Sequence, residues 1–409
     1  MKILIVDGLP ISFKTYRTDP KYLSDKGYQC TVICPQPKVF DKEFFKGYRN
    51  TKFFFCYELK YIGTNSYTLI FNRLMQVFSM IRNIRKILKK DNYDLIRSVG
   101  FLPTFCSIIA TRSKNNFNQI PIVFTCTDFY SDLYKQFNLP FFSVISGFLK
   151  KLECYIAKNA NVLIVDTPIQ RRHWGKLGFN EKKCVVIPHG YEDSLVQKQH
   201  NLSKIRYLYG IGEDTKIVFY CGDISTLDGI DILIKSAPSV LRELNVMFMI
   251  VGNGLKKYLD FLKSLARKLN IDKHIIFVGQ VSYSDMPSYI TSADVCVAPF
   301  RLSPTSDTAQ CYKVLAYVIL KKPAIVTSGK GVQELFGNII NYIPPENPDI
   351  LATTLIKVLQ QGPLSPEIKG KIDILAKRFN WGAIWEQEEK IFQAVVNHID
   401  NFQIFDFFK

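Results

Sequence analysis

The chain has 409 residues, of which 47% are hydrophobic and 22% charged, a composition that excludes an intrinsically disordered protein. This length exceeds one compact core and predicts two domains of about 150 to 200 residues each. The formal net charge of +17 indicates an anionic partner.

The class of that partner follows from what the sequence lacks. We expect no nucleic acid, because the chain contains no recognition motif and no run that interleaves aromatic with basic residues. An anionic membrane surface, or an acceptor that carries phosphate, fits the charge better. A basic surface without a specific partner is an equally weighted alternative.

Targeting and metal signals are also missing from the sequence. The first apolar run ends at Asp7, too early for a signal peptide, and no run approaches the roughly 18 apolar residues of a spanning helix. We therefore expect a cytoplasmic protein, with peripheral attachment to the inner face of the cell membrane as an option. The ten cysteines form no CxxC pair and no zinc-like cluster, which predicts free thiols and no metal.

The first half of the chain alternates apolar runs with helical segments, beginning with a strand, a helix at 20–26 and a second strand. Continuous apolar runs are typical of parallel strands that helices cover on both faces. The predicted strands are 2–8, 28–34, 93–98, 121–125, 161–165 and 183–188.

Residues 72–90 are predicted to form a basic amphipathic helix. Its apolar stripe, which includes Leu74 and Phe78, is expected to pack against the domain core. Its cations can still reach an anionic membrane surface while the stripe stays buried. A second segment, 138–152, is also apolar and then basic. The cations of the helix are Arg82, Arg85, Lys86, Lys89 and Lys90.

The strand and helix pattern restarts near Lys216, after a polar stretch at 191–204 that we take as the interdomain linker. The predicted domains are therefore 1–195 and 196–380, followed by a helix and an aromatic tail at 381–409. Two similar halves predict a ligand at the domain interface.

Residues 293–326 contain a strand (ADVCVAPF), a polar loop, a helix, a Lys-Pro break and a second buried strand, which is the order of a βαβ unit. The helix is expected to begin near Thr305, Ser306 or Asp307, where its free amides would attract phosphate. Upstream, Gly252, Gly254 and Gly279 follow apolar strands, where glycine allows close approach to a ligand.

These segments resemble the GT-B glycosyltransferases of the family 4 type. The resemblance covers most of the chain and includes the turn at 188–190, the strand and loop from Ile217, and a helix in which Lys313 and Tyr317 match the pattern Lys-Leu-x-Glu-Tyr. It implies an α/β protein with two Rossmann-like domains facing across a cleft and a terminal helix that returns to the first. A terminal helix of this kind is expected at 381–409.

The resemblance also implies the chemistry. We expect a retaining hexosyltransferase that takes a nucleotide sugar as co-substrate, needs no metal or other cofactor, and acts on a glycan or lipid-linked acceptor in cell-surface polysaccharide biosynthesis. The expected donor-binding residues are Gly222, Asp223, Gly252, Gly254, Gly279, Arg301, Ser306, Asp307, Thr308, Lys313 and Lys330.

Several positions depart from the family pattern. Asp223 and Asp228 stand where an Arg and a Lys would grip the donor diphosphate, so two carboxylates would repel it. Ala316 replaces the Glu that holds the ribose, and Thr308 its companion acid, with Asp307 one step away. Arg301 and Lys330 are expected either to restore the missing positive charge or to be plain surface cations, with Lys330 equally weighted between the two.

In the first domain, Asp128 matches a catalytic Asp, with Thr127 where His would precede it. A strand-end cap is an equally good interpretation of Asp128. Gly8 and Arg17 are the expected acceptor-side residues. His189 is interpreted as a turn residue rather than a catalytic one.

Two hypotheses follow from these residues. The leading one is a glycosyltransferase. The alternative is a catalytically silent GT-B subunit that binds a glycan or a partner transferase, because the departures at Thr127, Asp223, Asp228 and Ala316 all affect charge handling. A sugar-nucleotide epimerase is a weaker third interpretation.

Overall fold

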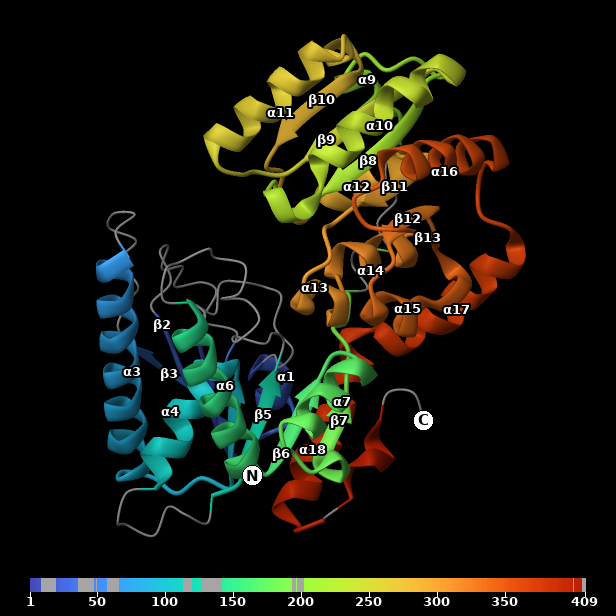
Figure 1. Ribbon diagram of the computed structural model, residues 1–409. Helices are drawn as coiled ribbons and strands as arrows, with labels where there is room; N and C mark the ends of the chain where they lie inside the picture. The colour runs from blue at the N-terminus through green and yellow to red at the C-terminus, as the bar shows by residue number, and fades with distance from the viewer. Residues whose placement is uncertain are drawn as a thin grey trace. The chain divides into compact units, whose positions relative to one another are not determined.

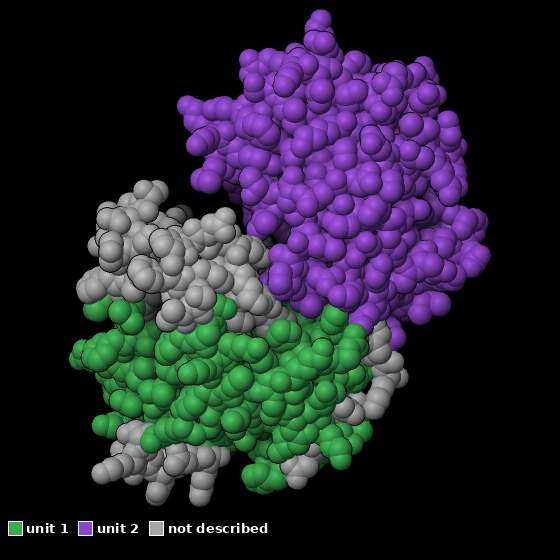
Figure 2. Space-filling model, viewed as in Figure 1, with its two compact units in different colours: residues 1–188, 382–409 green, residues 189–381 purple. Residues whose placement is uncertain are grey.

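The computed structural model describes residues 1–8, 20–35, 48, 50–56, 66–112, 120–126, 142–192, 196, 202–399 and 401–406 (Figure 1). It divides the chain into two compact units (Figure 2). The first contains residues 1–188 and 382–409, and the second contains residues 189–381. The division falls inside the turn that precedes the predicted linker.

The first unit is built on a seven-stranded parallel sheet with the order β3-β2-β1-β4-β5-β6-β7. Its strands are β1 (Lys2–Asp7), β2 (Gln29–Pro35), β3 (Thr51–Cys56), β4 (Leu95–Val99), β5 (Ile122–Cys126), β6 (Val162–Val165) and β7 (Cys184–Val186). Its helices include α1 (Pro20–Asp25), α3 (Ser66–Leu88), α4 (Phe101–Thr111), α6 (Phe142–Asn159), α7 (Pro168–Lys176) and α18 (Trp381–Val396).

The apolar runs explain this sheet. The central strands are buried along almost their whole length, because helices cover both faces. Phe124 of β5 meets Trp174 of α7 edge to face, with 5.5 Å between ring centroids. The start of α7 is fixed by Thr167, whose hydroxyl accepts a hydrogen bond from the Gln170 amide.

From Gly382 onward, α18 belongs to the first unit. Glu388 of α18 accepts a hydrogen bond from the Arg97 guanidinium at 3.0 Å, and both side chains are fully buried. The tail that follows packs on the same unit: Phe402 is buried, and the carboxylate of Asp406 accepts hydrogen bonds from Arg171 and from the Val186 amide. The described part of the aromatic tail therefore packs on this unit through Phe402 and Asp406, while Ile404 is exposed.

The second unit has a six-stranded parallel sheet with the order β10-β9-β8-β11-β12-β13. Its strands are β8 (Lys216–Cys221), β9 (Val246–Val251), β10 (Ile275–Gly279), β11 (Val295–Ala298), β12 (Ala324–Thr327) and β13 (Asn341–Ile343). Its helices include α9 (Leu202–Leu208), α10 (Ile230–Glu243), α11 (Lys256–Lys268), α12 (Met286–Ser292), α13 (Pro304–Thr308), α14 (Tyr312–Ile319), α15 (Lys330–Phe336), α16 (Pro348–Gln361) and α17 (Pro366–Phe379).

The predicted α/β class with two parallel-sheet, Rossmann-like domains is confirmed. Two strands, β3 and β13, were not predicted from the sequence; they lie at the edges of their sheets and are short or only half buried. The single helix predicted before Lys322 is two helices, α13 and α14. Cys311 has a left-handed φ of 57°, which interrupts the helix between α13 and α14.

The predicted apolar stripe of α3 is correct only in part. Ile84 and Leu88 of this stripe are buried, but Leu74 and Phe78 are 63% and 66% exposed. No helix among the described residues has the length and apolar content needed to cross a membrane.

Candidate functional site

The strongest candidate site lies at the carboxyl edge of the second unit's sheet. The strand order reverses between β8 and β11, so the loops after these neighbouring strands lead away in opposite directions. In open parallel sheets this switch point is where ligands bind. Gly222 and Arg301 follow the two strands, and Lys313 reaches the same place from α14.

Lys313 forms the centre of this site. Its ammonium lies 2.7 Å from Asp228 Oδ1 and 2.7 Å from the Tyr220 hydroxyl, and 4.5 Å from the centroid of the Tyr220 ring. A Cβ at Gly222 would lie 2.7 Å from Lys313 Nζ and would displace the flexible ammonium, and the φ of 135° at this position also favours glycine. The structure thus brings together two residues that the sequence predicted as donor ligands, Gly222 and Lys313.

Asp228 is the counter-ion of Lys313. Burial alone would raise the pKa of Asp228, but the Lys313 ammonium and hydrogen bonds from Lys313, Ser225 and Tyr220 hold it below its ordinary value. Burial would likewise lower the pKa of Lys313, yet the Asp228 carboxylate raises it. In this structure Lys313 neutralises the charge of Asp228, so the predicted repulsion of a diphosphate applies only where the lysine leaves the carboxylate.

Asp223 differs from Asp228. Its side chain is exposed, and among the described residues none pairs with its carboxylate. Its main-chain carbonyl lies 2.6 Å from the Tyr220 hydroxyl, whose single proton is shared between this oxygen and Asp228 Oδ1. Asp223 therefore remains a free negative charge on the loop, as the sequence analysis expected.

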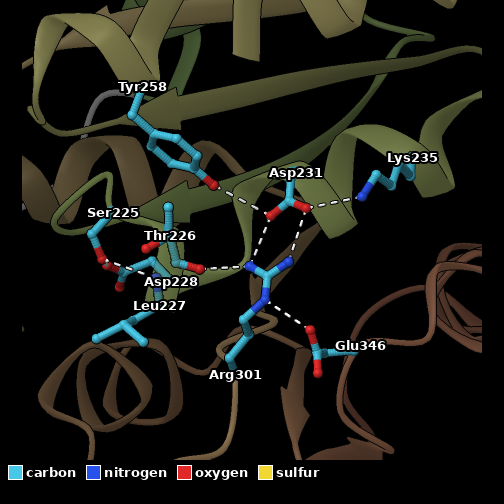
Figure 3. A network of polar contacts seen from close by, with 9 residues as sticks. All are labelled: Ser225, Thr226, Leu227, Asp228, Asp231, Lys235, Tyr258, Arg301 and Glu346. Carbon is cyan, nitrogen blue, oxygen red and sulfur yellow. Dashed lines mark hydrogen bonds and ion pairs between the residues drawn. The ribbon is translucent and has the colours of Figure 1, made fainter. Parts of the chain in front are cut away.

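Arg301 is held by acidic residues and is not free to bind a ligand (Figure 3). Its guanidinium makes two hydrogen bonds of 2.9 Å to the two oxygens of Asp231, and one of 2.9 Å to Glu346. It also donates to the Thr226 carbonyl at 2.5 Å. Four of its five N–H donors are thus satisfied, which corrects the expectation that Arg301 supplies charge to a donor.

Asp231, which binds Arg301, was not predicted as a site residue from the sequence. Burial would raise the pKa of Asp231, but hydrogen bonds from Arg301 and Lys235 lower it to about 2. Its carboxylate also accepts a hydrogen bond from the Tyr258 hydroxyl at 3.3 Å. The network ties the loop after β8, the loop after β11 and α10 together, as Figure 3 shows. No sequence motif marks this contact, since Asp231 and Arg301 are 70 residues apart.

The polar side chains of the loop before Lys313 form hydrogen bonds within their own segment. The helix α13 begins at Pro304, one residue before the predicted start near Thr305, Ser306 or Asp307, and its N-cap Ser303 forms a reciprocal capping box with Ser306. The Thr308 hydroxyl donates to main-chain carbonyls of its own helix.

Asp307 and Lys330 pair with each other. The carboxylate of Asp307 accepts hydrogen bonds from Lys330 Nζ at 2.8 Å and from the Lys330 amide at 3.0 Å. Of the two equally weighted interpretations of Lys330, this pairing favours the surface cation over a ligand of a diphosphate. Gly331, which the sequence analysis passed over, lets α15 approach α13, because a Cβ there would lie 2.5 Å from the carbonyl oxygens of Thr308 and Ala309.

Two of the predicted glycines serve the protein's own packing. A Cβ at Gly252 would lie 1.8 Å from the Gly222 carbonyl oxygen, and one at Gly254 would lie 2.0 Å from that of Ile224. These glycines let the loops after β8 and β9 pack backbone to backbone. Gly279 is different: with φ of 85° it ends β10, and a Cβ there would meet nothing within 4 Å.

Tyr317 and Ala316 complete the described face of α14. The Tyr317 hydroxyl is fully buried and accepts a hydrogen bond from the Cys221 amide at 3.0 Å, which anchors α14 to the end of β8. Ala316 lies three residues after Lys313, hence on the same helical face, and offers no hydrogen-bond acceptor from its side chain. Gln310, also missed, is buried and holds the main chain of His189.

Little of the predicted first-domain site lies within the described residues. Gly8 follows β1, and a Cβ there would come within 3.2 Å of Pro103 in α4. Its position at the carboxyl edge of the sheet fits the acceptor-side prediction, which stays a prediction. Arg17, Thr127 and Asp128 lie outside the described residues.

The predicted membrane-facing cations lie on α3. Arg82, Lys86, Lys89 and Lys90 are exposed, whereas Arg85 is half-buried and donates a hydrogen bond to the Ile109 carbonyl of α4 at 3.2 Å. Arg85 is thereby partly committed to packing, which corrects its assignment to the membrane surface. A hollow of about 450 Å³ runs along this face of α3 and is lined by Phe78, Ile81, Arg82, Arg85, Lys86 and Lys89.

Comparison with known proteins identifies a family for both units. Residues 21–195 match the model described as Glycosyltransferase Family 4, and residues 215–361 match Glycosyl transferases group 1. An uncharacterized glycosyltransferase of Methanocaldococcus jannaschii is 26% identical over 58% of this chain and 61% of its own length. The mannosylfructose-phosphate synthase of Agrobacterium fabrum is 24% identical over 50% of this chain and 46% of its own length. The phosphatidyl-myo-inositol mannosyltransferase of Mycobacterium tuberculosis is 24% identical over 77% of each.

Solved structures are similar over almost the whole chain. A glycosyltransferase from Rickettsia africae superimposes with a TM-score of 0.73, at 18% identity over 97% of this chain and 99% of that one. Anabaena HepE in complex with UDP-glucose gives a TM-score of 0.70, at 16% identity over 96% and 100%. At these identities the likeness concerns the fold.

Proposed function

Because the chain belongs to the GT-B glycosyltransferases of the family 4 type, we propose that it transfers a hexosyl group from a nucleotide sugar to a glycan or lipid-linked acceptor with retention of anomeric configuration. The observation that carries this proposal is the Lys313 ammonium at the switch point of the second sheet, next to Gly222. An ammonium at this edge suits a diphosphate.

The donor diphosphate takes over Lys313 from Asp228 in this proposal. The amides at the start of α14, where Cys311 provides no side-chain cap, add further donors for the same phosphates. Tyr220 and Ser225 hydrogen-bond Asp228, so its carboxylate keeps partners when Lys313 turns to the ligand. Lys313 then stabilises the charge that develops on the leaving diphosphate.

The reaction exchanges one bond at the anomeric carbon. The bond to the donor phosphate oxygen breaks, and a bond to the acceptor hydroxyl oxygen forms on the same face of the sugar. The acceptor proton passes to the departing diphosphate, which carries away the electron pair. This scheme comes from the family, and Lys313 is the residue of this chain that we assign to it.

Calorimetric titration tests the proposal. Purified protein is titrated with UDP, GDP, UDP-glucose and GDP-mannose, and micromolar affinity for at least one of them is expected. The variant Lys313→Met serves as the site control and Lys357→Met, an exposed lysine on α16, as the matched surface control. A correctly folded sample that binds none of the four would exclude the transferase.

A second candidate function is a silent subunit that binds a glycan or a partner transferase. The observation that favours it is the capture of Arg301 and Lys330 by acidic residues, which leaves Lys313 as the only predicted donor cation of the described second unit that lies at the switch point. Ala316 adds no acceptor for the ribose. Nucleotide binding with sugar release or transfer contradicts this alternative, whereas folded protein without nucleotide binding supports it.

We further propose that the first unit contacts an anionic membrane through the α3 surface, defined as Leu74, Phe78, Arg82, Lys86, Lys89 and Lys90. Exposed apolar side chains beside four exposed cations suit the boundary between lipid headgroups and acyl chains. Each cation near such a surface contributes on the order of 1 kcal/mol.

Flotation with vesicles of phosphatidylcholine and phosphatidylserine tests this surface. Replacing Arg82, Lys86, Lys89 and Lys90 by Ser is expected to abolish co-flotation at physiological salt. The matched control replaces Lys256, Lys257, Lys263 and Lys268 of α11, which removes the same charge from the second unit. An equal loss in both variants would mean that net charge, and not the α3 surface, governs attachment.

A further inference from the structure

A second cavity lies in the second unit, at the opposite edge of its sheet from Lys313. Its volume is about 600 Å³, within the range of small-molecule pockets. Lys216 begins β8, Asp294 immediately precedes β11 and Pro323 immediately precedes β12, so the cavity sits at the amino ends of three neighbouring strands. It is therefore distinct from the site at the carboxyl edge.

Four lysines line this cavity, and two of them are paired with carboxylates. Lys216 Nζ lies 3.3 Å from Asp294, and Lys321 Nζ lies 2.6 Å from Asp373. Asp294 is shared with Arg206, at 3.3 Å. The two acids thus serve three cations, and the charge around the cavity is positive before the remaining lysines are counted.

Lys322 and Lys369 have no carboxylate partner among the described residues. The Lys322 ammonium donates to the Ala293 carbonyl at 2.8 Å, which uses one of its three donors. Burial lowers the pKa of Lys322; the nearby Cys296 and Asp294 oppose this shift, and the cations Arg206 and Lys369 add to it. An anion in the cavity would offset both effects by pairing with this ammonium.

The backbone at the cavity rim is strained. Lys321 has a φ of 56°, the left-handed conformation that glycine adopts at the end of a helix. A lysine there costs on the order of 1 kcal/mol relative to its favoured conformations. This conformation closes the end of α14, because the amides of Lys321 and Lys322 donate hydrogen bonds to the carbonyls of Val318 and Tyr317.

The remaining wall of the cavity is apolar. Leu320, Pro323, Val358, Leu359 and Pro363 line it. A bare inorganic ion would leave these side chains without a contact, whereas a ligand with an apolar body would cover them.

We propose that this cavity binds a phosphate-bearing organic anion, whose phosphate pairs with Lys322 and Lys369 and whose apolar body packs on Leu359 and Pro363. Each charge-assisted hydrogen bond to phosphate contributes enough to change the affinity by about tenfold. The site does not depend on the proposed transferase activity, since it shares no residue with the switch point.

Calorimetric titration with phenyl phosphate and with inorganic phosphate tests the proposal, at an ionic strength held constant with chloride. Phenyl phosphate is expected to bind more tightly than inorganic phosphate. Lys322→Met and Lys369→Met should each lower its affinity about tenfold. Lys357→Met, the exposed neighbour of Val358, should leave it unchanged.

Thermal unfolding of each variant checks the fold. Lys369 is half exposed, so Lys369→Met keeps the test valid even if Lys322→Met destabilises the unit. Unchanged affinity in both variants would overturn the proposal. A loss of phenyl phosphate affinity in Lys313→Met alone would also overturn it, because the phosphate would then bind at the opposite edge of the sheet. Equal affinity for the two probes would contradict the apolar half of the site.

Discussion

Two ion pairs lie at the carboxyl edge of the second sheet, and their acids, Asp228 and Asp231, are three residues apart in the sequence. The two pairs hold their cations differently. The pair of Asp231 and Arg301 is a fork of two hydrogen bonds, reinforced by Glu346 and a main-chain carbonyl. The Lys313 ammonium has two polar partners, Asp228 and Tyr220. A planar guanidinium in a fork is fixed in place, whereas an ammonium on a flexible stem can change partners.

This difference separates a structural cation from a ligand-binding one. Arg301 holds two loops together, and the carboxylates of Asp231 and Glu346 neutralise its charge in the absence of a ligand. Lys313 is also neutralised, but by a single carboxylate that keeps two other hydrogen bonds when the lysine leaves. The two pairs should therefore respond in opposite ways to mutation, one in stability and the other in binding.

The largest effect is expected from Lys313→Met. Loss of two charge-assisted hydrogen bonds, at about 1.5 kcal/mol each or more, should weaken UDP binding by about a hundredfold. Calorimetric titration measures this change. The double variant Lys313→Met with Asp228→Asn removes both charges of the pair, so it should recover thermal stability without recovering affinity. Full UDP affinity in Lys313→Met would remove this lysine from the site.

Arg301→Met should act on stability instead. It leaves the buried carboxylate of Asp231 with Lys235 as its remaining cation and frees the loop at Ser225 to Gly229, which should lower the free energy of unfolding by about 2 kcal/mol. Arg301→Lys keeps the charge but loses the fork, so an intermediate loss is expected. Urea unfolding measures both. A variant as stable as the wild type would show that the network of Figure 3 does not hold the loops.

The same pair predicts a pH dependence. Hydrogen bonds from Arg301 and Lys235 outweigh burial and lower the pKa of Asp231 to about 2 from an ordinary 3.8. A lowered pKa stabilises the folded state above the ordinary value, and that stability, about 2 kcal/mol, is lost as the pH falls from about 4 through 2. The difference in unfolding free energy between the wild type and Asp231→Asn should shrink over this range. A constant difference would contradict the assigned pKa.

The fold could be predicted from the sequence because it depends on local patterns. Continuous apolar runs separated by helical segments specify a parallel sheet, and the strand-end glycines mark where its loops turn. The match of Lys313 to a helix motif likewise requires only neighbouring residues. Edge strands such as β13, three residues long and only partly buried, carry too weak a pattern to be found this way.

The partners of the charged residues could not be predicted, because they are set by tertiary contacts. Arg301 meets Asp231 across 70 residues, and Lys330 meets Asp307 across 23. Each of these side chains looks like a free surface charge in the sequence. The effect of Asp228 on a diphosphate could not be predicted for the same reason, because it depends on whether Lys313, 85 residues away, neutralises it.

Lys330→Met should have the smallest effect on UDP affinity of the variants considered. It therefore tests whether the distinction between Arg301 and Lys313 extends to an exposed ion pair. Lys330 is 65% exposed and paired with Asp307, so water screens its charge and a neighbouring carboxylate cancels it. Its replacement should change UDP affinity by less than about twofold, since a screened pair contributes well under 1 kcal/mol. The thermal unfolding midpoint should not move measurably. Asp307→Asn is the matched variant, because it removes the opposite charge of the same pair. If Lys330→Met weakened UDP binding as strongly as Lys313→Met, Lys330 would also bind the ligand. The number of polar partners that hold a cation would then not determine whether that cation can bind a ligand.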